Sequence, residues 1–418
     1  MSFFLSESLR SVFNRTVQLL AVRVASKQCD AVFRVLKPVT FVHAFVKPVI
    51  VEPAVANRRL ILLSEQFANR EQLVSDAARL ARLTSALEGE PLETVPYELR
   101  LGYEHVSMET ALKRLLPENV VAPVSFEVAG ELAHFNLRDE CLPFKELIGQ
   151  VVRDKNPRIR TVVNKVGQIK TAFRTFPLEV IAGEPNFDVE VSESGCRFRF
   201  DFSRVYWNSR LQAEHERLVG LFGATDVVYD MFAGVGPFAI PAAKKGCTVY
   251  ANDLNPASYE ALLANRQLNK VRDSRLLAFN LDARDFVRQH LAVQPKLQSH
   301  VIMNLPALGP SFCDCFRGVF AGKLAADAPA VMPIIHCYGF TKADDYAADM
   351  LRRVADALDV DALPPDAVGR YVREVAPQKI MVCVTFRLPR DIATAPPLSP
   401  AAKKRRTLDD AAAADDDE

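Results

Sequence analysis

The chain has 418 residues, of which 49% are hydrophobic and 25% are charged, and its formal net charge is +1. This length accommodates two or three domains with separate cores, and no apolar run approaches the roughly eighteen residues of a transmembrane helix. The eight cysteines show no CxxC spacing, which excludes a zinc ribbon or a disulfide framework and predicts buried, unpaired thiols in a reducing compartment.

The first thirty residues combine positive charge with serines and apolar residues. Arg10, Arg15, Arg23 and Lys27 are opposed only by Glu7 and Asp30. This composition resembles a mitochondrial transit segment, and the alternative is an ordinary amphipathic first helix.

Residues 30–95 are predicted to complete a small α+β domain. The β-branched runs 46–51 and 60–63 are typical of strands, and the more charged segment 65–90 favours helix. We place a domain boundary near residue 95. Residues 96–200 follow as a second α+β unit, in which Cys141 opens a helix and 197–202 alternates as a strand does.

A basic stretch runs from Arg153 to Arg174. It contains seven Lys or Arg residues and a single acid, Asp154. One interpretation is a face that binds nucleic-acid phosphates, and the other is an ordinary solvated surface. The candidates for phosphate contacts are Arg158, Arg160 and Lys165.

From Val205 onward the pattern changes to strands alternating with helices, which predicts a parallel sheet with crossover helices. The strand 226–230 runs into a turn containing Gly234 and Gly236, and the helix 239–245 follows. Pro237 is expected at the helix start, where a missing N–H is tolerated. The two glycines allow the backbone to approach a ligand closely.

Asp253 ends the next strand, where a carboxylate can accept hydrogen bonds from both ribose hydroxyls. A plain tight turn, a dinucleotide oxidoreductase and a methyl-donor site all remain compatible with this pattern. Asp230 before the turn suits a cofactor with a cationic amino-acid end, and we expect Phe238 to crowd the place of a phosphate. Both features favour the methyl donor.

A later strand, 300–303, ends in Asn304-Leu-Pro306. A strand-end asparagine whose backbone is fixed by proline can present its amide to a nitrogen heterocycle, whereas a dehydrogenase needs no such element. The position of this motif after the glycine-rich turn therefore favours a methyltransferase over a dehydrogenase. Asp282, after the strand near Phe279, either accepts the adenine amino group or caps the following helix.

Several segments together resemble the archaeal and eukaryotic tRNA guanine-37 N1-methyltransferases. They include 205–217, the turn 230–239, Ala251-Asn-Asp-Leu-Asn-Pro256 and Met303-Asn-Leu-Pro-Ala307, with further matches at 133–138, 148–157 and 375–379. The resemblance spans about residues 100–390. The open strand–helix pattern does not resemble the knotted fold of the bacterial enzymes with the same reaction.

The resemblance implies an α/β chain whose Rossmann-like class I methyltransferase domain, with a mainly parallel sheet, occupies 201–393. The smaller α+β domains 1–95 and 96–200 would bind RNA. Independently of the resemblance, the composition of 394–418, rich in Pro and Ala and then in charge, predicts a disordered tail. S-adenosyl-L-methionine would be the methyl donor, and the partner would be tRNA, held at its outer corner and anticodon arm. The candidate cofactor residues are His215, Asp230, Gly234, Gly236, Asp253, Leu254, Asp282, Ala283 and Asn304.

Guanine N1 carries a proton, so methylation needs a base, and charge then develops toward O6. The resemblance implies that Glu214 is this base and that Arg174 stabilises O6, while Arg210 organises the same loop. Asn304 and Pro306 would shape the base pocket. Glu214 could instead pair with Arg217 along its helix, and Arg174 could contact a phosphate. His215 stands where other members have arginine.

The expected protein is therefore a monomeric tRNA methyltransferase without a metal site or membrane anchor. The alternatives are another RNA-base methyltransferase and a catalytically silent tRNA-binding protein. The N-terminal composition and the basic cluster 403–406 favour the mitochondrial matrix, the nucleus and the cytoplasm as compartments.

Overall fold

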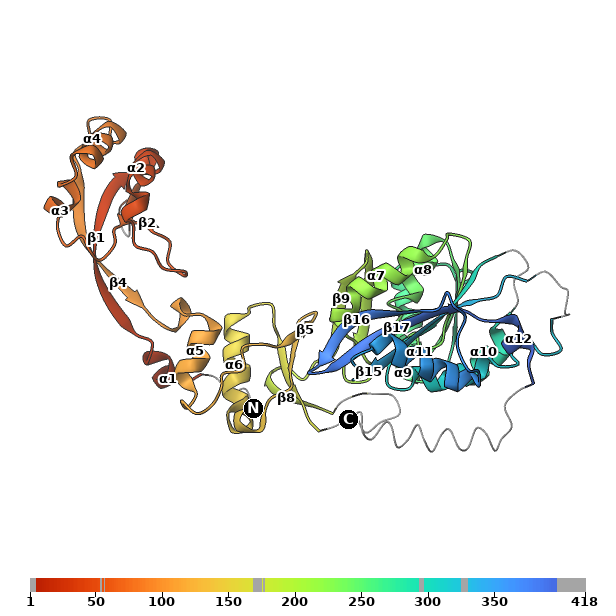
Figure 1. Cartoon of the computed structure of the whole chain (residues 1–418). Coiled ribbons are helices and arrows are strands. Elements are labelled where there is room, and N and C mark those ends of the chain that lie inside the picture. Colours follow the sequence, from red (N-terminus) through yellow and green to blue (C-terminus); the bar gives the residue numbers. More distant parts are fainter. Residues whose placement is uncertain are drawn as a thin grey trace. The chain divides into compact units, whose positions relative to one another are not determined.

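A computed structural model of the chain describes residues 5–52, 55, 57–167, 175, 177–292, 297–324 and 330–396 (Figure 1). The chain divides into two compact units. The first comprises Met1–Glu127, Ala133–Asn164 and Glu179–Pro185, and the second comprises Val128–Leu132, Lys165–Leu178 and Asn186–Glu418. The expected tail from residue 397 onward lies outside the described residues.

The first unit begins with an antiparallel sheet in the order β2-β3-β1-β4. Its strands are β1 (Arg15–Ala25), β2 (Val49–Val51), β3 (Arg58–Leu62) and β4 (Glu93–Leu101). The predicted amphipathic first helix is wrong, because only α1 (Glu7–Ser11) is helical before the inner strand β1. The boundary expected near residue 95 falls inside β4.

Both faces of β1 are buried. On one side Val22 and Val24 pack with residues of the short helices that cover the sheet, and on the other side Val17 and Leu19 join a second cluster. These helices are α2 (Cys29–Leu36), α3 (Arg70–Val74) and α4 (Ala77–Ala86) (Figure 1). Burial on two faces explains the apolar run in this strand.

A second core in the first unit forms around α6 (Lys145–Lys155). Ile148 and Val151 pack against Phe135, Val162 and Ile181. The helix expected from Cys141 begins as a 3₁₀ turn over Asp139–Phe144 and becomes α-helical at Lys145. The remaining elements are α5 (Met108–Leu115), β5 (Glu127–Ala129), β6 (Leu132–Phe135), β7 (Thr161–Lys165) and β8 (Leu178–Gly183).

The second unit contains a seven-stranded sheet in the order β13-β12-β11-β14-β15-β17-β16. The first five strands in this order are parallel, and β17 is antiparallel to both of its neighbours. The mainly parallel, Rossmann-like sheet is therefore confirmed. Its strands are β11 (Val227–Asp230), β12 (Thr248–Asn252), β13 (Leu276–Phe279), β14 (Ser299–Met303), β15 (Ile334–Thr341), β16 (Val368–Ala376) and β17 (Lys379–Arg387).

Helices cover both faces of this sheet. On one face Phe286 of α10 (Ala283–His290) and Met350 of α11 (Tyr346–Leu358) pack with Tyr229, Val301 and Val382. The other helices of the unit are α7 (Gln212–Leu221), α8 (Ala239–Lys245), α9 (Pro256–Leu268) and α12 (Arg390–Thr394), and a ribbon of β9 (Asp188–Glu193) and β10 (Cys196–Asp201) precedes them. Among the described residues, no helix has the length and apolarity needed to cross a membrane.

Candidate active site

Three parallel strands of the second unit end at one edge of the sheet, and each delivers a polar residue there. β11 ends at Asp230, β12 is followed by Asp253 and β14 is followed by Asn304. The register aligns Asp230 with Ala251 on one side and with Ile302 on the other. Ligands of open α/β sheets bind outside the carboxyl ends of the strands, where these three residues lie.

Asp230 is completely buried, and among the described residues neither of its carboxylate oxygens has a hydrogen-bond partner. The pKa of this carboxyl is raised to about 8, mainly by burial and to a smaller extent by the nearby Asp253, against the opposing effect of the Phe232 backbone amide. An uncompensated buried acid is costly to a folded protein. Such a group is suited to receive a cation from a ligand.

The glycine-rich turn uses its two glycines differently. Gly234 has φ 54°, and a Cβ added there would meet nothing within 4 Å, so this part of the backbone borders open space. Gly236 has φ 101°, and an added Cβ would lie 2.7 Å from Leu262 Cδ1. The first glycine therefore leaves room for a ligand, and the second allows close packing of the turn on α9.

Asp253 links the second strand to this turn. Its Oδ2 accepts a hydrogen bond from the Gly234 amide at 2.8 Å, and its Oδ1 accepts one from the Asn255 amide at 2.9 Å. Burial raises the pKa of this carboxyl. Each oxygen of an ionised carboxylate has two acceptor sites, so both keep one for a ribose hydroxyl.

The helix after the turn, α8, spans Ala239–Lys245 as predicted, but the expected place of Pro237 at its start is wrong. Pro237 does not occupy the first helical turn, because α8 starts at Ala239 with Phe238 at its N-cap. Phe238 is 2% exposed, and its ring packs against His215 and Tyr338. The expectation that this ring crowds a phosphate position is therefore wrong, because the side chain belongs to the core.

Asn304 leaves β14 with a buried Oδ1 that has no hydrogen-bond partner among the described residues. Pro306 follows, and its carbonyl accepts from the Phe340 amide at 3.1 Å, which ties this loop to β15. Asp282 caps α10, since its Oδ1 accepts from the Arg284 amide at 2.9 Å. Leu254 is 50% exposed beside Asp253, whereas Ala283 is buried in the first turn of α10.

Glu214 lies in the first turn of α7 and is 8% exposed. Its Oε2 accepts from Arg217 Nε at 2.7 Å, and its Oε1 accepts from Arg217 Nη2 at 2.6 Å and from the Tyr338 hydroxyl at 2.7 Å. The pairing with Arg217 that the helical spacing predicts is thus confirmed. The contact with Tyr338, from the middle of β15, carries no signal in the local sequence.

His215 follows Glu214 and is buried as well. Its Nδ1 lies 2.5 Å from Glu193 Oε1, and its ring meets Phe238 edge-on at 4.6 Å between centroids. Phe238 in turn lies 6.2 Å from the Tyr338 ring. The start of α7, the glycine-rich turn and β15 are therefore packed together around Glu214.

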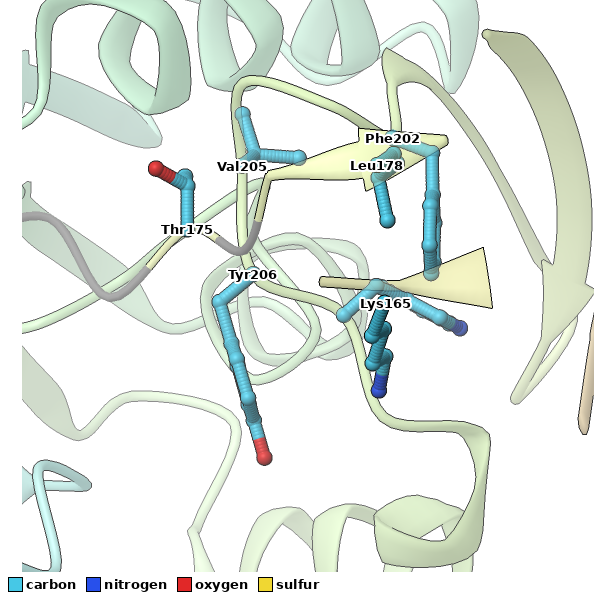
Figure 2. Close-up of a pocket in the computed structure, with 7 residues that line it drawn as sticks. Lys165, Thr175, Leu178, Phe202, Val205 and Tyr206 are labelled. Atoms are coloured by element: carbon cyan, nitrogen blue, oxygen red, sulfur yellow. The ribbon is translucent and has the colours of Figure 1, made fainter. Parts of the chain in front are cut away.

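Sequence reasoning missed a pocket in the second unit that is lined in part by the segment preceding α7 in the chain (Figure 2). The Tyr206 ring is 49% exposed there, and the buried Trp207 Nε1 has no hydrogen-bond partner among the described residues. The Trp207 ring is fixed by Phe198 and Phe200 at 5.5 and 5.2 Å. Two consecutive aromatic residues before a predicted helix were the available signal. The pocket is lined by Lys165, Thr175, Leu178, Phe202, Val205, Tyr206 and Trp207.

The cationic candidates are distributed unevenly. Arg158 and Arg160 are exposed in the first unit just before β7, whereas Lys165 lines the pocket of the second unit. Arg210 is exposed in the turn before α7, where its amide donates to Asn208 Oδ1 at 3.1 Å. Arg174 lies outside the described residues, so its predicted place at guanine O6 stays a prediction.

The parallel sheet, the acid at the end of β11, the glycine-rich turn and the acid after β12 define a Rossmann-like methyltransferase domain. Comparison with family models agrees with this class. Residues 189–360 match the TRM5/TYW2 methyltransferase domain, and residues 108–186 match the TYW2 N-terminal domain.

Similar proteins narrow the class further. The chain is 41% identical to a tRNA (guanine(37)-N(1))-methyltransferase of Phytophthora infestans, over 92% of each chain. It is also 41% identical to the protein of that name from Danio rerio, covering 93% of this chain and 82% of the relative. The chain therefore belongs to the family of tRNA (guanine(37)-N(1))-methyltransferases.

Solved structures show the same fold. The protein aTrm5, in a complex with tRNALeu, matches 88% of this chain and 100% of its own, with 25% identity and a TM-score of 0.65. Trm5b of Pyrococcus abyssi matches 88% of this chain and 98% of its own, with 26% identity and a TM-score of 0.58.

Proposed function

We propose that this protein transfers the methyl group of S-adenosylmethionine to N1 of guanosine 37 in tRNA, with Glu214 as the proton acceptor. Family membership supports the reaction, and one observation in the site supports the role of Glu214. This carboxylate is buried, and three hydrogen bonds from Arg217 and Tyr338 fix its orientation. Tyr338 follows Cys337, the residue opposite Met303 in the parallel pair of β14 and β15, so it lies level with Asn304.

The residues at the strand ends fit S-adenosylmethionine. The unpartnered Asp230 carboxylate suits the cationic amino group, and the free acceptor sites of Asp253 suit the two ribose hydroxyls. Leu254 offers an exposed apolar surface to the adenine, and Asp282 keeps its second oxygen for the adenine amino group. When bound, the cofactor supplies an electrophilic methyl group.

Glu214 retains the capacity to accept the N1 proton. A carboxylate has about four acceptor sites, of which Arg217 and Tyr338 occupy two on Oε1 and Arg217 occupies one on Oε2. The remaining site on Oε2 is available for the guanine N1–H. Burial and Glu214 hold the pKa of the Tyr338 hydroxyl well above its usual value, so this hydroxyl stays a donor and orients the carboxylate.

Other groups would hold the guanine. The unpartnered Asn304 Oδ1 can accept from the base, and the Tyr206 ring offers an exposed face for stacking. By resemblance, Arg174 would meet the charge that develops at O6, and Arg210 would organise the loop. Arg158, Arg160 and Lys165 would contact phosphates of the anticodon arm.

The test uses the purified full chain, labelled S-adenosylmethionine and two tRNA transcripts that differ only in G or A at position 37. We expect label in the G37 transcript alone, and nucleoside analysis should identify 1-methylguanosine. Equal labelling of both transcripts would refute the N1-guanine assignment. Binding of both transcripts without methylation would support a silent tRNA-binding protein instead.

We infer that the protein acts as a monomer and that its substrates are tRNAs of the mitochondrial matrix, the nucleus or the cytoplasm. The N-terminal composition that suggested import overlaps β1, which pairs with both β3 and β4, so removal of the first thirty residues would break the sheet. A suitable test therefore keeps the whole chain with a C-terminal tag and compares two variants, one with Arg10 replaced and one with the basic cluster 403–406 replaced. If the cellular distribution of both variants equals that of the wild type, these targeting roles are refuted.

A further inference from the structure

The outer strand of the seven-stranded sheet, β16, carries two arginines without a carboxylate partner among the described residues. Arg370 is exposed and has no hydrogen bond or ion pair there, and Arg373 donates from Nε to the Glu374 carbonyl at 3.3 Å. Arginines of the helices α10 and α11 are instead paired with acids. The pair on β16 is therefore free to bind an anion.

The strand register places Arg370 on the face of the sheet that carries the catalytic candidate. Arg370 is opposite Cys383, and Cys383 is opposite Tyr338, whose hydroxyl binds Glu214. Residues directly opposite in antiparallel strands point to the same face. Burial and, after it, the charge of Glu214 raise the pKa of the Cys383 thiol, which agrees with this placement.

A β-bulge brings Arg373 to the same face. Arg373 is three positions after Arg370, so in a regular strand the two side chains would point to opposite faces. The register shifts between Tyr371 and Arg373, however, and Arg373 is opposite Met381. Met381 is two residues before Cys383 and shares its face. The bulge therefore places the side chains of Arg370 and Arg373 on the same face of the sheet, and we call this pair the row.

The row lies at a suitable distance from the reaction. β16 is two strands from β15, whose Tyr338 binds Glu214, so the two backbones are about 10 Å apart. This separation equals the length of about three stacked nucleotides along one nucleic-acid strand. We propose that Arg370 and Arg373 bind phosphates of the tRNA strand that flanks the reacting guanosine. Guanidinium groups form strong, bidentate hydrogen bonds with phosphate oxygens. This inference rests on the proposed function.

The test compares two double variants of the full chain. The first is Arg370→Ala with Arg373→Ala. The matched control, Arg288→Ala with Arg352→Ala, removes the same charge from helices α10 and α11, where Arg288 pairs with Asp285 and Arg352 pairs with Asp349 and Asp356. Steady-state methylation of a G37 transcript is measured at several salt concentrations, together with S-adenosylmethionine affinity.

We expect the β16 variant to raise the KM for tRNA while kcat at saturating tRNA and cofactor affinity stay near wild type. Loss of two phosphate contacts lowers the slope of log affinity against log salt by about 1.4–1.8. Between about 50 and about 200 mM salt, wild-type affinity should therefore fall roughly 7- to 12-fold more than that of the variant. Arg370→Lys with Arg373→Lys should restore most of the slope, because it keeps both charges.

Other outcomes overturn the inference. Equal salt slopes for wild type and the β16 variant, with intact cofactor binding, would refute phosphate contacts by this row. Charges on an edge strand also prevent pairing between copies, so a variant that self-associates but keeps its tRNA KM would assign them that role instead. If the wild-type protein methylates no tRNA, the proposed function itself is refuted, and this outcome is distinct from a failure of the phosphate contacts.

Discussion

Replacement of Asp230 by asparagine should stabilise the free protein and weaken cofactor binding. The carboxyl is completely buried, and its pKa is about 8, against an ordinary value of 3.8. At pH 7 this difference costs the fold about 4 kcal/mol as an upper bound. A buried asparagine amide without partners costs about 1–3 kcal/mol in return, so a net gain of about 1–3 kcal/mol is expected.

The gain has a defined pH dependence. A carboxyl whose folded pKa is raised above its unfolded value loses stability as pH rises from about 4 to about 8, and the loss is constant above that. The difference in unfolding temperature between Asp230→Asn and wild type should therefore grow over this window and then level off. Thermal unfolding without cofactor, at pH values from 5 to 9, measures it directly.

The same substitution, Asp230→Asn, should lower the affinity for the cofactor. Loss of a charge-assisted hydrogen bond to the cationic amino group costs about 1.5–3 kcal/mol, which is roughly a 10- to 150-fold weaker affinity. Because the free carboxyl is mostly protonated at pH 7, the wild type should release nearly one proton on binding S-adenosylmethionine, and calorimetry in two buffers detects it. A variant with lower stability and unchanged affinity would refute the reasoning.

Three further predictions concern the same unit. Glu214→Gln should lower kcat about 10²- to 10⁴-fold with cofactor affinity kept, and single-turnover methylation would show it. Gly236→Ala should destabilise the fold, since its Cβ would lie 2.7 Å from Leu262, whereas Gly234→Ala should mainly weaken cofactor binding; unfolding and binding curves of both variants separate the two effects. His300 and His336 are hydrogen-bonded to each other at 3.1 Å, and burial lowers the pKa of both. The free energy of unfolding of the wild type should therefore fall as pH drops below about 6.5. His336→Gln should reduce this loss, and acid unfolding curves of the two proteins would show it.

The sequence predicted the local features of the site well. Helix α8 spans Ala239–Lys245 as expected, and the strands before Asp230, Asp253 and Asn304 end where the apolar runs end. These features depend on residues close together in the chain. Glycine at positive φ and short continuous apolar runs carry that information directly.

Features that depend on distant residues were not predictable in this way. β1 was expected to be a transit segment or helix, yet it pairs with β4 from Arg15 opposite Leu101 onward. The Tyr338 hydroxyl reaches Glu214 across 124 positions in sequence. The shared face of Arg370 and Arg373 requires a bulge that neither residue type announces. Each of these depends on strand register, which non-local packing determines.

The distribution of unsatisfied polar atoms links stability to function in this protein. Among the described residues, nine buried side-chain polar atoms have no hydrogen-bond partner, and four of them belong to Trp207, Asp230 and Asn304. Each such atom costs about 1–3 kcal/mol in the free protein. Because ligands that bind only the folded state stabilise it, S-adenosylmethionine and tRNA would recover this cost at the site where it is concentrated. The same groups that weaken the empty fold would thus give the two proposed substrates their differential affinity for it.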